Sequence, residues 1–397
     1  MAFTVKDRTF NSSIDPLKTV HQLAETIDGY AAEGEQLRRL APPLHEALLK
    51  AGLFRMLLPK SYNGLEVDPL TFLRTIGAVA QLDGSTAWCL CQGNGCAMVS
   101  AYLNDGIATK IFGDDPRAVL AWGPGNAQAQ IVNGGYRVSG RLAFASGGRH
   151  ATWLGCHVPV YQTDGSQRLN PNGTPEIRTM LFPESNVQWI DTWDVIGLRA
   201  TGSDDFEIDN LFVPEDYTTI RDTSKTRTQQ KPLYTMPSMS LYAMGFSATA
   251  QGLATGMLEA FKELALDKTP RLAHSKMKDN PVIQSDLAQC EARIRAARSY
   301  LTTEIEEIWE EILNTEKLTI ANRMRIRLAA THGIHEAKAV AENIYDLAGV
   351  SAIRNESPFQ RRYRDIRSVT QQLQGRRSHF QTVGAYLLGH DADLAVA

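Results

Sequence analysis

IVNGGYRVSGRLAFASG, residues 131–147, is the stretch that decides the fold of this chain. It opens with an Asn-Gly-Gly turn, and the residues after the turn alternate between apolar and polar, which predicts a strand with one buried face. The apolar positions of that face are Tyr136, Val138, Leu142 and Phe144. The strand then runs into Ser146 and two glycines. Either it ends in an ordinary polar turn, or it delivers a hydroxyl and flexible backbone to a ligand.

This strand belongs to a β segment that interrupts an otherwise helical sequence. Short apolar runs separated by Gly, Pro and Asn continue through residues 119–228. Residues 15–118, and those that follow Pro237, instead show apolar spacings of three and four, which are typical of helices. We therefore expect an α+β, mainly helical chain with a helical domain at 1–118, a β domain at 119–228 and a helical bundle at 229–397.

The longest expected helix covers residues 283–312, where apolar residues recur at steps of four and three and form one continuous seam. Segments 317–348 and 366–388 supply partner helices. The seam carries more apolar positions than one antiparallel neighbour covers, so the pattern predicts packing against further helices or another subunit. The seam residues are Ile283, Leu287, Cys290, Ile294, Ala297, Leu301, Ile305, Ile308 and Ile312.

Composition excludes several classes of function. The 397 residues carry 41 basic and 44 acidic side chains, a formal net charge of −3, so no field favours nucleic acid or an anionic membrane. We see neither an apolar run long enough for a membrane span nor a signal peptide. Five cysteines without a CxxC pair indicate reduced thiols and a cytoplasmic protein.

The order of these parts, with five motifs, resembles the acyl-CoA dehydrogenase fold over nearly the whole chain. The motifs are GLFRMLLPKSYNGLEVD (52–68), DGSTAW (83–88), GGYRVSGRLAFASG (134–147), WDVIGLRATGSDDFEIDNLFVP (193–214) and LAGVSAI (347–353), followed by RRYRDIRSV (361–369). The resemblance implies a central β-barrel or sandwich and a C-terminal four-helix bundle. It also implies that a flavin ring lies between them.

The resemblance assigns residues to that flavin. It places Phe144, Ala145 and Ser146 along the edge of the ring, with the Ser146 hydroxyl or a backbone amide donating to the flavin N5 side, and Trp122-Gly123 beside the ring. Judged from local sequence alone, a turn residue is the commoner explanation for Ser146. Trp122 and Trp88 fit a wall beside a flavin or an aromatic substrate and a place in the core equally well, and the resemblance favours the flavin for Trp122. The form F-x-S-G is similar to the flavin-dependent monooxygenase branch of the fold.

The position of the catalytic base separates the branches. Acyl-CoA dehydrogenases remove a proton with a carboxylate, and at the matching positions this chain has Gln374 and, on the first bundle helix, no acid before Glu259. We therefore expect the oxygenase component of a two-component monooxygenase, which oxidises a small aromatic or heteroatom-containing substrate through a flavin C4a-hydroperoxide. The alternatives are an acyl-CoA dehydrogenase-like oxidoreductase with an unrecognised base, and a catalytically silent flavin- or acyl-binding scaffold.

Two positions that carry histidine in many monooxygenases of this fold match Gln372 and Asn94 here. Both amides can orient a substrate but cannot act as bases, which argues against phenol ortho-hydroxylation. Trp88 is a candidate wall for an aromatic substrate. His379, seven residues after Gln372, is expected two turns along the same helical face, as a substrate ligand or as a solvated histidine.

The resemblance also implies the anchors and partners of the cofactor. Arg271 matches a basic residue that pairs with the flavin pyrophosphate. Gly349 matches a glycine at which the backbone passes close to the cofactor. In proteins of this fold, both residues commonly come from a neighbouring subunit of a homotetramer. The flavin is reduced FMN or FAD, supplied with O2 by a separate NAD(P)H-dependent flavin reductase. No GxGxxG or P-loop indicates an internal nicotinamide site. The trio His332, His335 and Glu336 is the nearest approach to a metal motif, and we expect no metal there.

Overall fold

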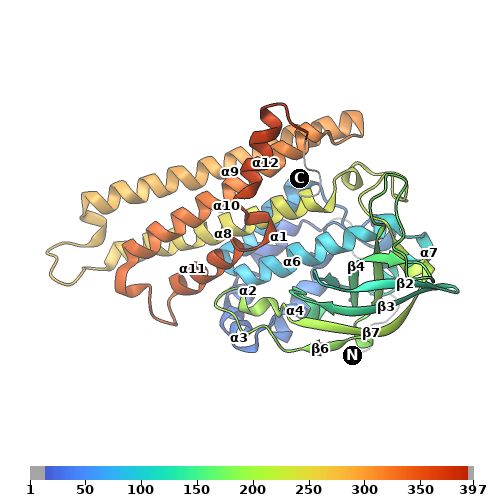
Figure 1. Ribbon diagram of the computed structural model, residues 1–397. Helices are drawn as coiled ribbons and strands as arrows, with labels where there is room; N and C mark the ends of the chain where they lie inside the picture. The colour runs from blue at the N-terminus through green and yellow to red at the C-terminus, as the bar shows by residue number, and fades with distance from the viewer. Residues whose placement is uncertain (1–13, 392–397) are drawn as a thin grey trace.

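The structure, a computed structural model, describes residues 14–391 (Figure 1). N-terminal helices pack beside a curled sheet, and long C-terminal helices extend away from it. The helices that precede the sheet are α1 (Pro16–Gln22), α2 (Ala24–Gly29), α3 (Ala31–Leu37), α4 (Pro42–Lys50), α5 (Pro69–Leu82), α6 (Gly84–Ala97) and α7 (Asp105–Ala108). The helices that follow it are α8 (Ser238–Asp267), α9 (Pro281–Thr315), α10 (Ile320–Ala348), α11 (Pro358–Val369) and α12 (Ser378–Leu387). The expected fold class is confirmed.

The sheet has eight strands in the order β6-β7-β3-β2-β4-β5-β8, with β1 paired in parallel to β4. Tyr136, Val138 and Leu142 of β3 lie in its core, as the alternation predicts, but Phe144 does not. Its φ of 55° turns the side chain outward, and the residue is 62% exposed. The strands are β1 (Leu120–Trp122), β2 (Gln128–Val132), β3 (Gly135–Leu142), β4 (Trp153–Tyr161), β5 (Ile177–Pro183), β6 (Gln188–Ile190), β7 (Asp205–Pro214) and β8 (Thr218–Thr219).

The seam of α9 is covered within the chain. Its positions from Cys290 to Ile312 are buried against α8 and α10, while Ile283 and Leu287 are partly buried. The seam therefore gives no support for a further subunit, because two neighbours of the same chain already cover it.

The expected helix over 366–388 is wrong. The helix α11 ends at Val369, Gln372 is extended, and α12 begins only at Ser378. The Gln372 side chain accepts a hydrogen bond from the Gln374 backbone N–H and so stabilises the turn between the two helices. Gln372 and His379 consequently do not share a helical face.

The five cysteines are buried and free. Burial raises the pKa of the Cys96 thiol to about 12, which keeps it protonated and unreactive. Within residues 14–391, we find no helix that is both long and apolar enough to cross a bilayer.

Candidate functional site

The segment after β3 brings Ser146 to the junction between the sheet and the helices. Its backbone is fixed by the segment that precedes β7: Ala145 N–H donates to the Asp204 carbonyl at 3.2 Å, and Gly147 N–H to the Thr201 carbonyl at 2.8 Å. Gly147 has a φ of 75°, a conformation that glycine adopts without strain. These bonds hold Ser146 at 9% exposure, two residues after the outward-turned Phe144.

The Ser146 hydroxyl belongs to a hydrogen-bond chain whose direction is determined. Thr201 Oγ1 donates its proton to the Leu198 carbonyl at 2.8 Å, because a carbonyl can only accept. Ser203 must then donate to Thr201 at 2.7 Å, and Ser146 to Ser203 at 2.8 Å. Trp88 Nε1, which can only donate, points at Ser146 Oγ from 3.0 Å. Ser146 therefore retains one lone pair and no free proton.

This direction corrects the expected role of the Ser146 side chain as a donor. While the chain of hydroxyls is intact, Ser146 can only accept a further hydrogen bond. Reduced flavin carries a proton on N5, whereas oxidised flavin presents a lone pair there. The hydroxyl therefore fits the reduced form of a flavin better than the oxidised form.

An aromatic row continues from Trp88 into the bundle. Trp88 stacks on Phe246 of α8 with ring centroids 4.0 Å apart, and Phe246 stacks on Tyr242 at 5.7 Å. Tyr242 OH lies 3.4 Å from Cys96 Sγ. The three rings are between 1% and 7% exposed, so they form an enclosed apolar wall next to Ser146.

Two aromatic side chains at the same junction, Phe144 and Trp193, are at least partly exposed to solvent. Phe144 and the half-buried Trp193 meet edge to face at 6.1 Å. Gly123 of the segment after β1 lies against this loop, where a Cβ would come within 1.9 Å of the Ala143 carbonyl oxygen. A side chain at position 123 would therefore displace the segment that carries Phe144 and Ser146.

Trp122 belongs to a different apolar cluster from Trp88. Its ring lies 4.6 Å from that of His157, and the Arg221 guanidinium sits 4.8 Å from its centroid. The residue is 6% exposed and belongs to the core between β1 and the N-terminal helices. The structure thus packs Trp122 in this core, and the tryptophan that bonds to Ser146 is Trp88.

Asn94 is a structural residue in this molecule. It is completely buried, its Oδ1 accepts from Leu57 N–H at 3.1 Å, and its Nδ2 donates to the carbonyls of Leu53 and Leu90. Both amide protons are used, so the expectation that Asn94 orients a substrate is corrected. Its side chain fixes the loop before α5 against α6.

Gln374, the residue at the expected base position, is buried beside Arg327 of α10. Its Oε1 accepts from Arg327 Nη1, and its Nε2 points to Met239 Sδ at 3.9 Å. His379 is 1% exposed rather than solvated, and its Nε2 donates to the Leu373 carbonyl at 2.7 Å. Burial and then Arg327 lower the pKa of His379, so its ring is neutral near pH 7.

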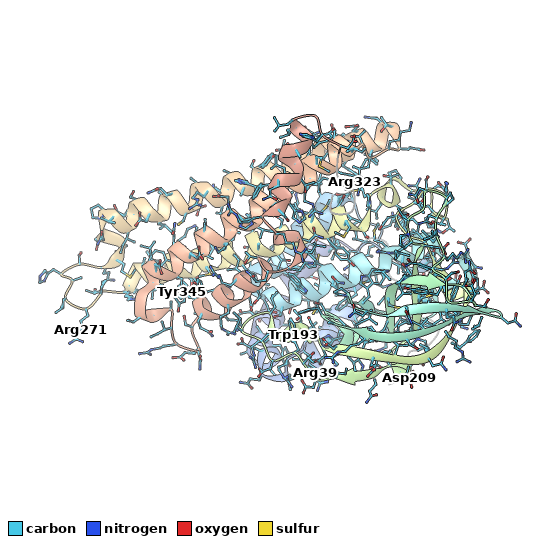
Figure 2. All side chains as sticks on the ribbon, in the orientation of Figure 1. Arg39, Trp193, Asp209, Arg271, Arg323 and Tyr345 are labelled. Atoms are coloured by element: carbon cyan, nitrogen blue, oxygen red, sulfur yellow. The ribbon has the colours of Figure 1, made fainter. Side chains whose placement is uncertain are left out.

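Arg271 and Gly349 lie at the far end of the bundle. Figure 2 shows Arg271 on the loop between α8 and α9, far from Trp193 and the sheet. Lys268 Nζ donates to the Ala348 carbonyl at 2.7 Å and joins this loop to the end of α10, where Gly349 has a φ of 57°. Within one chain, neither residue is near Ser146.

Two members of the trio on α10 are bonded to other protein groups, and the ring of the third, His332, lies 6.0 Å from that of Tyr300. Glu336 forms an ion pair with Arg293 at 2.8 Å, and His335 Nε2 donates to the Gly375 carbonyl at 3.0 Å. Among the described residues, no group of three His, Cys, Asp or Glu side chains is arranged to hold a metal ion.

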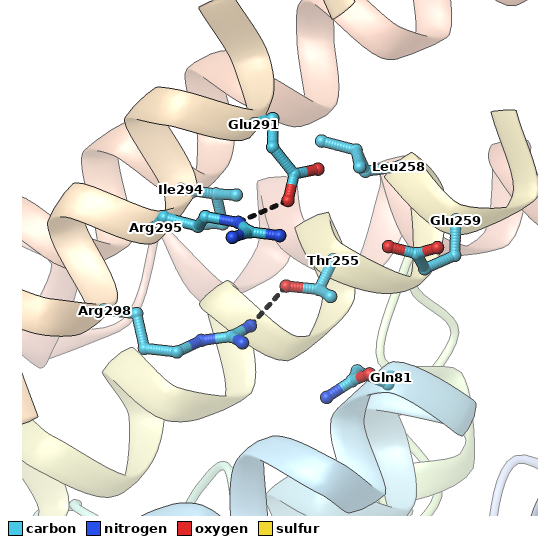
Figure 3. A pocket seen from close by; sticks show the side chains of 8 residues that line it. All are labelled: Gln81, Thr255, Leu258, Glu259, Glu291, Ile294, Arg295 and Arg298. Atoms are coloured by element: carbon cyan, nitrogen blue, oxygen red, sulfur yellow. Dashed lines mark hydrogen bonds and ion pairs between the residues drawn. The ribbon is translucent and has the colours of Figure 1, made fainter. Parts of the chain in front are cut away.

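A pocket opens between α5, α8 and α9 (Figure 3). Arg298 donates to Thr255 at 2.6 Å and Arg295 bonds to Glu291, so charged side chains of the bundle surface form its walls. Thr255 lies nine residues after Phe246 along α8, about 13 Å at 1.5 Å per residue. The pocket is therefore separate from the Ser146 site.

The sequence singled out Ser146 and Trp88, which the structure joins by a hydrogen bond, but it did not single out Ser203 and Thr201, which orient the Ser146 hydroxyl. Ser203 and Thr201 stand in the motif at 193–214, yet only the fold brings them to Ser146. Arg327 could have been identified from the sequence, because it is a charged residue on the apolar face of α10 between Met324 and Ile334, both of which are buried.

Comparisons with known proteins agree with this architecture. Residues 244–374 match the family model described as acyl-CoA dehydrogenase, C-terminal domain. The chain is 30% identical to the indole-3-acetate monooxygenase of Pseudomonas putida over 90% of this chain and 89% of that one. It is 26% identical to the flavin-dependent monooxygenase, oxygenase subunit HsaA, of Rhodococcus jostii over 88% and 91% of the two chains. The crystal structure of 3-HSA hydroxylase from Rhodococcus sp. RHA1 superposes with a TM-score of 0.89 at 25% identity, covering 97% of this chain and all of that one.

Proposed function

The chain belongs to the flavin-dependent monooxygenases of the acyl-CoA dehydrogenase fold, and from this premise we propose that Ser146 and its hydrogen-bonded neighbours hold the N5 edge of reduced flavin. The observation that carries the proposal is the hydroxyl chain from Ser146 to the Leu198 carbonyl, because it leaves Ser146 as an acceptor. Phe144 and Trp193 supply apolar surface for the ring beside that edge.

The comparisons confirm the expected class of enzyme. The chain is the oxygenase component of a flavin-dependent monooxygenase that uses reduced flavin and O2, and the acyl-CoA dehydrogenase alternative is not supported. When bound, the reduced flavin supplies the activation of O2 and the transfer of one oxygen atom. The protein's own residues position the flavin and the substrate and exclude water between them.

We propose that the substrate is a small aromatic molecule that lies along Trp88, Phe246 and Tyr242. These rings form a buried apolar wall that begins at Ser146, so an aromatic ring on them is next to the flavin edge. Gln372 and His379 act through the turn at 373–375: the first caps it, and the second bonds to its carbonyl. Neither side chain needs to act as a base, because oxygen transfer to an electron-rich ring requires only positioning.

We propose a homotetramer in which Arg271 and Gly349 reach the flavin of a neighbouring subunit. Both residues lie at the far end of the bundle, too distant to serve the Ser146 of their own chain. Apolar side chains at this end are exposed, which supports a covering subunit. They are Leu272 (91%), Val282 (66%), Val350 (75%) and Ile353 (65%). An NAD(P)H-dependent flavin reductase completes the system, and the free thiols favour the cytoplasm.

The test is a single-turnover reaction with labelled oxygen. Protein is mixed anaerobically with reduced FMN or reduced FAD, and then with ¹⁸O₂ and indole-3-acetate. We expect a product that carries one ¹⁸O atom, and none when oxidised flavin replaces reduced flavin. If reduced flavin fails to bind, or if all the oxygen appears as hydrogen peroxide with every aromatic substrate offered, the proposal is wrong.

A further inference from the structure

Within residues 14–391, Arg327 is a buried cation without an anionic partner. It is 1% exposed, and the hydrogen bond that it makes in this part of the chain runs from Nη1 to the neutral amide of Gln374. Nε and Nη2 are also buried and have no hydrogen-bond partner among the described residues. Burial, and then the nearby cation Arg323, lower the pKa of Arg327 to about 10. A guanidinium in this state is unfavourable unless a negative group pairs with it.

Arg55 and Arg362, which are also buried, differ from Arg327 in that each donates several hydrogen bonds to backbone carbonyls. Arg362, which is 8% exposed, donates from Nη1 and Nη2 to the carbonyls of Pro358, Gln81 and Leu82. Arg55, which is 2% exposed, donates to the carbonyls of Tyr62 and Phe112, among others. These two arginines tie loops to helices. Arg327 makes no comparable set of backbone contacts, so a structural role does not account for it.

The helix α8 connects Arg327 to the Ser146 site. Gln374, the partner of Arg327, contacts Met239, and Met239, Tyr242 and Phe246 are spaced so that they lie on one face of α8. The distance from Met239 to Phe246 along the helix is about 10 Å, from seven residues at 1.5 Å each. A bicyclic aromatic ring with a one-carbon acid side arm has about this length.

We propose that Arg327 binds the carboxylate of the substrate, which is therefore an aromatic acid whose ring lies along Tyr242 and Phe246 toward Ser146. The planar guanidinium has donors in the fork geometry that a carboxylate accepts, and the unpartnered Nε and Nη2 lie on one edge of it. The third guanidinium nitrogen, Nη1, donates to the Gln374 side chain, which carries no charge and so does not neutralise the charge of Arg327. This inference rests on the proposed function, because the ring position is defined relative to the flavin edge at Ser146.

The test compares an acid with its neutral isostere. Affinities for indole-3-acetate and indole-3-acetamide are measured by calorimetry, anaerobically, with reduced FMN bound. We expect the wild type to bind the acid roughly 30-fold or more tighter than the amide, as for other buried charged hydrogen bonds. In Arg327→Met the ratio should approach one. In Gln374→Glu it should also fall, because the new carboxylate pairs with Arg327.

The matched control is Arg325→Met, on the same helix. Arg325 is paired outward with Glu304 and Glu307, so its loss should leave the acid-to-amide ratio unchanged. Equal wild-type affinities for the two ligands, absence of binding by both while reduced FMN binds, or an unchanged ratio in Arg327→Met would each overturn the inference. Failure of reduced FMN to bind would instead count against the proposed function.

Thermal unfolding without any ligand gives a readout that is independent of flavin. If Arg327 serves a ligand, its replacement by methionine removes an unpaired buried charge, and the melting temperature should stay equal or rise. A fall of several degrees would show that Arg327 stabilises the fold and would overturn the inference. Arg55→Met, which removes a fully bonded arginine, should show such a fall.

Discussion

Ser203→Ala should change which redox state of flavin the protein prefers. In the wild type, Ser146 donates to Ser203, so it offers only a lone pair to a ligand. Removal of the Ser203 hydroxyl releases the Ser146 proton, and the same oxygen can then donate to the lone pair on N5 of oxidised flavin. The substitution should therefore strengthen binding of oxidised flavin, while reduced flavin, which donates from N5, should lose little.

The size of the effect follows from one hydrogen bond in a buried site. In the wild type, oxidised N5 faces an oxygen that cannot donate to it, and a buried acceptor left unsatisfied costs about 1–3 kcal/mol. The ratio of oxidised to reduced dissociation constants should consequently fall by roughly 5- to 150-fold in Ser203→Ala. Ser146→Ala removes the acceptor as well and should weaken reduced-flavin binding instead.

The assay is an anaerobic titration of FMN and FAD in both redox states, followed by absorbance and protein fluorescence. Ser100→Ala is the matched control, since Ser100 is a buried serine bonded to the Ala97 carbonyl and has no link to Ser146. If Ser203→Ala keeps the wild-type ratio within twofold for both flavins, the hydroxyl chain does not direct Ser146 and the reasoning fails.

Three further predictions concern stability and assembly. Burial, then Asp83, raises the pKa of Asp365 from 3.8 to about 7, so the folded state keeps a proton that the unfolded chain releases. As the pH rises from about 4 to about 7, the free energy of unfolding should therefore fall, by at most about 4 kcal/mol. Urea titrations across this range should show a smaller fall for Asp365→Asn than for the wild type. An equal fall in both proteins would contradict the prediction. Asn94→Ala should cost about 3 kcal/mol of stability without changing the affinity for reduced flavin, and a selective loss of that affinity would restore its role at the site. Sedimentation should give a tetramer mass, and Arg271→Ala should weaken flavin binding without changing that mass; a monomeric mass would count against the proposed assembly.

The sequence predicted the order of the parts because periodicity is a local property. The alternation after the turn at 133–135 places three side chains of β3 in the sheet core, and the seam over 283–312 lies within α9. The expected helix over 366–388 fails for an equally local reason. Gln372 takes an extended conformation and caps the next turn with its side chain, a competition between side chain and helix that apolar spacing does not record.

The site was harder to predict, because its chemistry depends on the direction of hydrogen bonds between distant segments. Ser146 stood out as a hydroxyl at the end of a strand, but whether it donates or accepts is decided by Leu198, three hydrogen bonds away through Ser203 and Thr201. Because a carbonyl has no proton to donate, Thr201 must be the donor to Leu198, and the donor of each further hydrogen bond in the chain is then determined in turn. Reversal of any bond would leave the Leu198 carbonyl without this donor. The redox preference of the site is therefore a property of the whole chain of four groups, and no single residue in the sequence carries it.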